Sequence, residues 1–173
     1  MKRLLKILGV TLICVYSFNT VNAQTAKADK KAARSVETSR IINAKNYIFN
    51  ANYVLPLHGG GKQLSGEYSV SVSKNKLVIY LPYFGRAYIA PMDASDGGIK
   101  LNTIHFDYKA ERNKKGNWDV VIKPKDRETS GSKDVQLLRL SISADGYASL
   151  QVTSLNRESI SFNGTIEEQK KEK

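Results

Sequence analysis

The stretch LRLSISADGYASLQV, residues 138–152, decides the fold class of this chain. Apolar residues alternate with polar ones on both sides of the dipeptide Asp145-Gly146. Successive side chains of a strand point to opposite faces of a sheet, so this period of two describes a half-buried strand. An Asp-Gly pair between two such runs is a strong signal for a tight hairpin turn. The stretch therefore predicts two antiparallel strands with one face in a core.

The same pattern recurs along most of the chain. Alternating or apolar runs cover residues 46–53, 68–73, 76–81, 118–122 and 160–166. We expect a further strand over 85–91, and a long strand over 99–108 with a β-bulge at Asn102-Thr103, where the apolar positions change parity. Eight or nine short strands joined by turns predict a mainly β fold, either an antiparallel barrel or a two-layer sandwich, preceded by one N-terminal helix.

Residues 1–23 have the three parts of a secretory signal peptide. Lys2, Arg3 and Lys6 precede an apolar run over 7–18, and Val21-Asn22-Ala23 supplies small residues before a cleavage site. The run is shorter than a membrane-spanning helix requires. We therefore expect an exported protein, periplasmic or secreted, without a transmembrane span after cleavage. Cys14, the only cysteine, leaves with this leader.

Behind the leader the sequence predicts three segments. These are a basic helical lead over 24–45, a single β-rich domain over 46–166 and a charged, disordered tail over 167–173. The net charge of the whole chain is +11, and removal of the leader leaves 24 basic against 16 acidic residues, or +8. Such a charge favours anionic surfaces, and in an exported protein these are envelope polysaccharide or lipid headgroups rather than nucleic acid.

Residue types that carry chemistry are few and scattered. His58 and His105 are the only histidines, and nothing in the pattern places them together. His58 precedes three glycines, but no Gly-x-Ser-x-Gly nucleophile turn accompanies them. Asp93 and Asp96 lie in a glycine turn without the spacing of a calcium loop. We therefore expect no catalytic residues, no metal and no cofactor, and the chain is interpreted as non-enzymatic.

One segment gathers aromatic rings around an arginine. LPYFGRAYIAP, residues 81–91, holds Tyr83, Phe84, Arg86 and Tyr88 between two prolines. Rings that stack on apolar faces and a guanidinium with fixed donors would suit a sugar or another polar ligand. The alternative is a strand corner that the rings fill. Asn156-Arg157-Glu158 has a similar ambiguity: it either ties down a turn, or Arg157 joins Arg86 at the rim of a site.

Three stretches carry a family resemblance. LPYFGRAY, DGGIKL and GYASLQVTSLNRESISFNGTI resemble a family of exported Bacteroidetes proteins known only as a domain of unknown function, DUF4251. The similarity runs from about Lys45 to Ile166. The resemblance implies the domain limits and the envelope location, and it implies no activity or ligand.

The residues and the resemblance together favour one function over two others. We expect an exported envelope protein whose β-domain binds a small molecule or a glycan-like polymer. Tyr83, Phe84, Arg86, Tyr88 and Arg157 are the candidate ligand-binding residues. The alternatives are a hydrolase with a carboxylate-based site and a structural interaction protein of the envelope. The sequence leaves the oligomeric state open.

Overall fold

The structure, a computed structural model, describes residues 29–89, 97–126 and 134–170. The predicted signal peptide with Cys14, the predicted turn at Asp93 and Asp96, and the end of the predicted tail lie outside these residues. Every structural statement below concerns the described residues.

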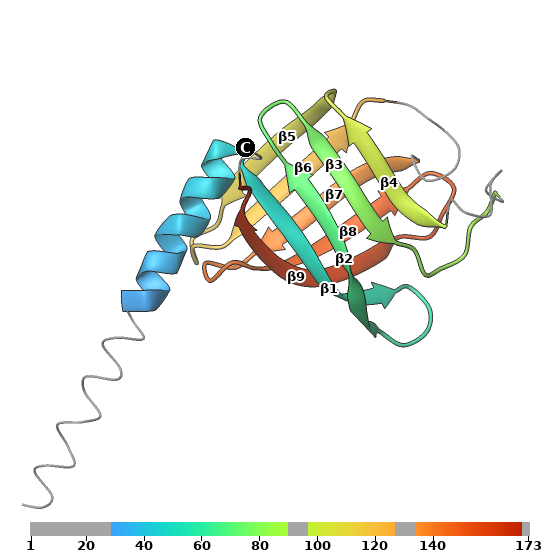
Figure 1. Cartoon of the computed structure of the whole chain (residues 1–173), viewed down its shortest axis with the longest axis horizontal. Helices are drawn as coiled ribbons and strands as arrows, with labels where there is room; N and C mark the ends of the chain where they lie inside the picture. Colours follow the sequence, from blue (N-terminus) through green and yellow to red (C-terminus); the bar gives the residue numbers. More distant parts are fainter. Residues whose placement is uncertain (1–28, 90–96, 127–133, 171–173) are drawn as a thin grey trace, which may run out of the picture.

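Nine strands form one antiparallel sheet. They are β1 (Tyr47–Pro56), β2 (Lys62–Val72), β3 (Leu77–Pro82), β4 (Gly98–Thr103), β5 (Phe106–Arg112), β6 (Trp118–Pro124), β7 (Val135–Ile142), β8 (Tyr147–Ser154) and β9 (Ile160–Glu168). Their order in the sheet is β4-β3-β2-β1-β9-β8-β7-β6-β5, so the first and last strands pair and β4 and β5 form the edges. Figure 1 shows the sheet curling into a nearly closed barrel. The predicted antiparallel β fold is confirmed, and of the two architectures the barrel is the one observed.

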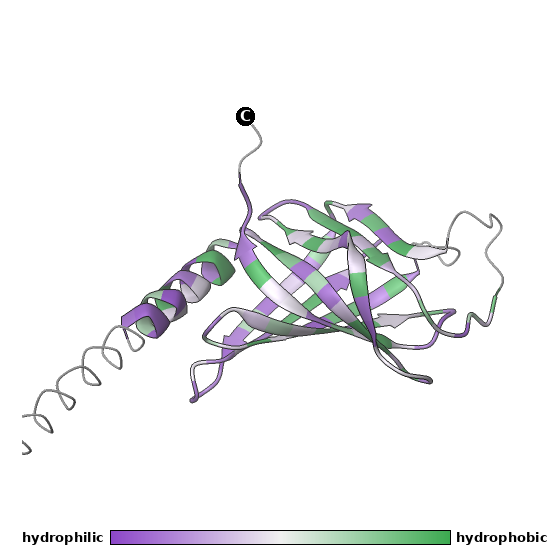
Figure 2. Cartoon of the chain, turned by 60° about the horizontal axis from the view of Figure 1, so that its bottom comes forward, coloured by the Kyte–Doolittle hydropathy of each residue, from purple (hydrophilic) through white to green (hydrophobic). Residues whose placement is uncertain are grey.

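Alternate side chains of the strands fill the inside of this sheet. Figure 2 shows the resulting alternation of hydrophobic and hydrophilic residues along the strands. The largest fully buried side chains include Tyr47, Phe49 and Phe162. In β3, Leu77 is buried but Tyr80 is 50% exposed. Although the run over 77–81 is apolar throughout, it is therefore buried on one face only, because the outer face of an antiparallel sheet can meet solvent.

Residues 29–44 form the predicted N-terminal helix, which lies at one end of the barrel (Figure 1). Ile41 and Ile42 are buried, whereas Val36, which lies on the opposite side of the helix at 3.6 residues per turn, is 71% exposed. The Tyr108 hydroxyl donates to the Ile42 carbonyl at 3.3 Å and ties β5 to the last helical turn. The helix ends at Lys45, whose φ of 50° is left-handed. None of the described helical residues forms a segment long and apolar enough to cross a membrane.

We call this end of the barrel the helix end, and the opposite end, where β1 stops and β9 begins, the distal end. Pro56 of β1 pairs with Ile160 of β9 at the distal end, and Tyr47 pairs with Glu168 at the helix end. β9 thus includes the first two residues of the predicted tail. Nη2 of Arg40 in the helix lies 2.7 Å from Oε2 of Glu168, and this ion pair holds the end of β9.

The long strand predicted over 99–108 is wrong, and with it the bulge at Asn102-Thr103. The chain forms β4 and β5 instead, separated by Ile104 and His105. Thr103 is buried and Ile104 is 66% exposed, the reverse of the predicted facing. The Thr103 hydroxyl donates to Asp126 and accepts from the His105 amide. A side chain 23 residues away therefore helps to turn the corner where the sequence suggests a continuous strand.

A bulge does occur, in β1. The register of β1 with both β2 and β9 shifts between Ala51 and Tyr53, so Asn52 is the extra residue. Because of this shift Val54, rather than Tyr53, is fully buried. The strand predicted over 85–91 is also wrong as far as the structure describes it, since residues 85–89 make only an isolated bridge between Ala87 and Arg157.

Candidate functional site

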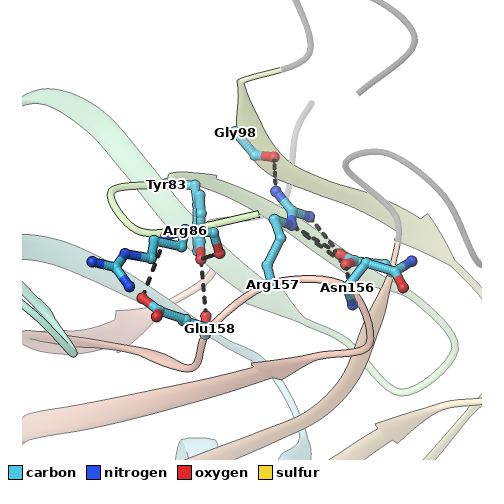
Figure 3. A network of polar contacts seen from close by, with 7 residues as sticks. Tyr83, Arg86, Gly98, Asn156, Arg157 and Glu158 are labelled. Atoms are coloured by element: carbon cyan, nitrogen blue, oxygen red, sulfur yellow. Dashed lines mark hydrogen bonds and ion pairs between the residues drawn. The ribbon is translucent and has the colours of Figure 1, made fainter. Parts of the chain in front are cut away.

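The aromatic segment after β3 lies at the distal end, against the connection between β8 and β9. Around the Ala87–Arg157 bridge, the Tyr88 amide donates to the Asn156 carbonyl at 2.7 Å, and the Glu158 amide donates to the Arg86 carbonyl at 3.1 Å. The structure thus brings together the two segments that the sequence analysis singled out, as Figure 3 shows.

Arg157 lies inside this junction and is only 8% exposed. Its Nη2 is 2.5 Å from Oδ1 of Asp134, which is 2% exposed, and its Nη1 donates to the Gly98 carbonyl at 2.8 Å (Figure 3). Asp134 also accepts from the Asn156 amide at 3.1 Å. The guanidinium therefore joins the starts of β4 and β7 to the β8–β9 connection, and its position is that of a structural clamp.

Tyr83 packs beneath the same guanidinium. The Arg157 guanidinium carbon is 5.0 Å from the centre of the Tyr83 ring. The Tyr83 hydroxyl contacts the carbonyl oxygens of Arg86 at 2.8 Å and Glu158 at 3.2 Å. Burial, reinforced by the Glu158 carboxylate, raises the pKa of Tyr83. A Cβ at Gly85 would lie 2.7 Å from the Tyr83 hydroxyl, so this close approach requires the glycine.

Glu158 adds a second buried carboxylate to the junction. It accepts a hydrogen bond from the Arg86 amide at 3.3 Å, and its Oε2 lies 3.5 Å from Nδ1 of His58. The side chain of Glu158 is 8% exposed and that of His58 is 65% exposed. The glycine loop after β1, which the sequence leaves unattached, is thereby held at the distal end.

The remaining candidate residues point outward rather than into a common pocket. Phe84 is 37% exposed, with Lys62 Nζ 5.1 Å from its ring centre, and Tyr88 is 70% exposed. Arg86 is exposed, and its backbone rather than its side chain makes the contacts with Glu158. The five predicted site residues therefore divide into two that hold the junction, Tyr83 and Arg157, and three on the surface.

A different surface forms a hollow, which we call the outer hollow. It lies on the outer face of the sheet over β1, β9, β8 and β7 and has a volume of about 490 Å³. No charged residue lines it, although a quarter of the chain is charged. Its lining consists of amide, hydroxyl, aromatic and small residues: Asn52, Tyr53, Asn117, Ser141, Ser143, Tyr147, Ala148, Ser149, Asn163, Gly164 and Thr165.

The register of the strands explains how these residues meet. Tyr53 pairs with Asn163, which pairs with Ser149, which pairs with Ser141, so four strands contribute one cross-strand row. Thr165 pairs with Tyr147 in the adjacent outward row. The Tyr147 amide in turn donates to the Ser143 hydroxyl at 3.2 Å. Polar side chains far apart in the sequence thus form a continuous patch.

The bulge in β1 shapes the floor of the outer hollow. The amide nitrogen of Asn52, in the orientation that satisfies its neighbours, donates to the carbonyls of Asn50 at 3.0 Å and Asn163 at 3.2 Å. A Cβ at Gly164 would lie 1.9 Å from the Asn50 carbonyl oxygen, so β1 and β9 approach closely only because this residue is glycine. Sequence reasoning missed the hollow, and its local signal was the row of uncharged polar residues at alternate positions of two strands, Ser141 and Ser143 before the turn and Tyr147 and Ser149 after it.

Acidic side chains do not gather into a reactive cluster. No group of three or more His, Asp or Glu side chains suited to hold a metal is found within residues 29–89, 97–126 and 134–170. The two buried carboxylates of the distal end, Asp134 and Glu158, both accept hydrogen bonds from protein donors.

Comparisons with known proteins agree with the fold. A family model described as "Domain of unknown function (DUF4251)" matches residues 29–166. The crystal structure of a DUF4251 family protein from Bacteroides eggerthii DSM 20697 superposes with a TM-score of 0.54 at 15% sequence identity, covering 80% of this chain and 91% of that one. At this identity the likeness concerns the fold alone. No curated protein matches the chain.

Proposed function

Since this chain belongs to the DUF4251 family, a domain of unknown function, we propose from its geometry that it is a non-enzymatic binding domain of the bacterial envelope whose outer hollow binds a neutral glycan. The single observation that carries the proposal is the chemistry of the hollow, whose uncharged lining combines hydroxyl and amide groups with apolar surface that includes Tyr53 and Tyr147. The leader over residues 1–23 supports the envelope location.

Neutral sugars suit this lining for a physical reason. Their hydroxyl groups both donate and accept hydrogen bonds, as do the side chains of Asn163, Ser149 and Thr165 in the hollow. Their C–H faces are apolar and stack on aromatic rings, which Tyr53 and Tyr147 provide. A charged ligand would find no opposite charge among the lining residues. The hollow therefore favours a neutral glycan over an anionic or cationic one.

The extent of the hollow indicates an oligosaccharide segment rather than one sugar. The row from Tyr53 to Ser141 crosses four strands. Three spacings between neighbouring strands give roughly 14 Å. An open surface of this length allows a chain to enter and leave at both ends. The lining contains no carboxylate, so it lacks the paired acids of a glycosidase, and binding without hydrolysis is the activity that we infer.

The experiment is a binding titration of the full chain with neutral gluco-, manno-, galacto- and xylo-oligosaccharides, followed by calorimetry. We expect one class to bind, and Tyr53→Ala, Tyr147→Ala and Ser149→Asp each to weaken its affinity by at least tenfold. Tyr88→Ala is the matched control, because Tyr88 is an equally exposed tyrosine at the distal end. Binding should persist in about 1 M salt, because a Debye length of about 3 Å screens interactions between exposed charges but leaves hydrogen bonds and ring stacking to a neutral sugar in place.

Three results would contradict the proposal. The first is an affinity that Tyr88→Ala or Arg86→Ala reduces while the hollow variants do not, which would move the site to the aromatic segment. The second is release of the ligand by salt, which would indicate an anionic ligand. The third is cleavage of the oligosaccharide during the titration. Circular dichroism spectra of all variants verify that each protein is folded.

A further inference from the structure

The exposed apolar side chains of this protein gather at one place. Among the described residues ten large hydrophobic side chains are exposed, and six of them belong to the segments that meet at the distal end. We call these six the apolar tip: Leu55, Leu57, Phe84, Tyr88, Ile89 and Leu155. Their exposed fractions run from 37% for Phe84 to 70% for Tyr88. Scattered exposed residues need no explanation, but a concentrated set marks an interaction surface.

Backbone contacts hold the three segments of the apolar tip together. Pro56, between Leu55 and Leu57, pairs with Ile160 at the start of β9. The Ala87–Arg157 bridge lies two residues before Ile89 and two after Leu155. The buried clamp formed by Arg157 and Asp134 fixes the same junction. The tip is therefore a preformed surface on a rigid support.

Basic side chains accompany the apolar tip among the described residues. Within its three segments, as far as the structure describes them, and at the start of β2, the exposed lysine and arginine side chains are Lys62 and Arg86. The acidic residues of the junction, Asp134 and Glu158, are 2% and 9% exposed, and both accept hydrogen bonds from the protein. The surface that a partner meets at this end thus combines apolar rings and branched chains with positive charge.

We propose that the apolar tip is a membrane-docking surface that inserts into the headgroup region of an anionic lipid bilayer. Moving the leucine and isoleucine side chains from water into lipid is favourable in free energy, because it removes apolar surface from water. The aromatic rings of Tyr88 and Phe84 suit the boundary between headgroups and acyl chains. Lys62 and Arg86 would bind lipid phosphates, with their stems along the apolar surface. A groove for a protein segment would need a concave lining, whereas these side chains project from loops at the end of a barrel.

This docking surface is distinct from the glycan-binding hollow and does not depend on it. The hollow lies over the outer face of β7, β8, β9 and β1, and its second row ends at Ser143 and Tyr147, beside the helix end. Asp145, in the same turn, lies 3.9 Å from Lys31 of the helix. A domain docked by its distal end would keep the hollow free for a ligand.

The first test measures where the chain contacts lipid. An environment-sensitive fluorophore on Leu57→Cys, in a Cys14→Ser background, should brighten at least threefold with vesicles of phosphatidylcholine and phosphatidylglycerol at 7:3. The same label on Lys109→Cys, an exposed position of β5, is the control and should not respond. A label at position 57 that stays dark with these vesicles overturns the proposal, even if the predicted leader itself binds lipid.

The second test separates the apolar and basic contributions by vesicle sedimentation of the full chain. We expect Leu57→Ser with Ile89→Ser, and separately Lys62→Gln with Arg86→Gln, to lower binding by at least fivefold. Tyr147→Ser with Lys109→Gln is the matched control and should bind as the parent does. Pure phosphatidylcholine vesicles should bind at least tenfold more weakly. Equal sedimentation of all variants overturns the proposal, as does a vesicle-independent dimer that the tip substitutions abolish.

Discussion

At the scale of single residues, the buried pair of Arg157 and Asp134 governs the distal end. Both side chains are less than 10% exposed, and the guanidinium also reaches the Gly98 carbonyl. Removing a charge from water is costly, so a buried pair persists only where each partner satisfies the other. The sequence analysis selected Arg157 as a candidate ligand-binding residue. Its partner Asp134 lies 23 residues away in the sequence, and only the fold reveals that the guanidinium is bound to that carboxylate.

The residue-scale prediction concerns this pair. Asp134→Ala would leave the Arg157 guanidinium buried without its carboxylate, and we expect a loss of about 3–5 kcal/mol in the free energy of unfolding. Urea denaturation measures it. The matched control is Glu111→Ala, which breaks the exposed pair of Lys109 and Glu111, where the two atoms are 2.6 Å apart, and should cost less than about 1 kcal/mol.

The double substitution Asp134→Leu with Arg157→Met tests the reason for that loss. If burial of an unpaired charge causes it, removing both charges should recover most of the stability lost in Asp134→Ala. A double variant as unstable as the single one would mean that the lost contacts to Gly98 and Asn156, rather than the orphaned charge, dominate.

At the scale of elements, local sequence patterns predicted most strands and turns, but they did not predict contacts between residues distant in the sequence. The hairpin of β7 and β8 follows from alternation and Asp145-Gly146, and its turn has the positive φ of 84° at Gly146 that such a turn needs. The corner between β4 and β5 depends on Asp126, which no pattern near Thr103 announces. The outer hollow was equally hidden, because it exists only once the register of four strands sets its rows side by side.

The helix shows what periodicity does predict within one element. Val36 precedes Ile41 and Ile42 by five and six residues, so at about 100° per residue it lies on the opposite side of the helix, and it is 71% exposed. The side that faces the barrel carries Thr38, Ile41 and Ile42, and all three are buried.

The element-scale prediction therefore contrasts two positions of the helix. Ile42→Ala should remove a fully buried side chain and lower the free energy of unfolding by about 2–5 kcal/mol, because a cavity remains beneath the helix. Val36→Ala, at a position 71% exposed, should change it by no more than about 0.5 kcal/mol. Thermal or urea unfolding measures both. Equal effects would show that the side of the helix that carries Val36 is also packed in solution.

At the scale of the whole molecule, the pairing of the first and last strands places both ends of the domain in the middle of the sheet. β1 joins β2 on one side and β9 on the other, and the two edges of the nearly closed barrel are formed by β4 and β5. The helix lies at one end of the barrel, and the apolar tip occupies the other. Docking of the tip on a membrane, as proposed above, would direct the helix away from the lipid.

The last prediction concerns the helix end and the stability of the molecule in alkali. The hydroxyl groups of Tyr47 and Tyr108 are 3.4 Å apart beneath the helix. Burial raises the pKa of both, that of Tyr47 most strongly. Raised folded pKa values mean that, above pH about 10, the unfolded chain loses these protons before the folded chain does. The free energy of unfolding should therefore keep the whole contribution of these two groups below pH about 10 and decrease as the pH rises above that value.

Urea denaturation at a series of pH values from 8 to 11.5 measures this fall, and Tyr108→Phe decides its cause. This substitution removes one of the two coupled hydroxyl groups, so the slope above pH about 10 should become shallower. Tyr88→Phe, on the exposed apolar tip, should leave the slope as in the parent. If Tyr108→Phe gave the same slope as the parent, the two buried tyrosines under the helix would not be the cause of the alkaline loss.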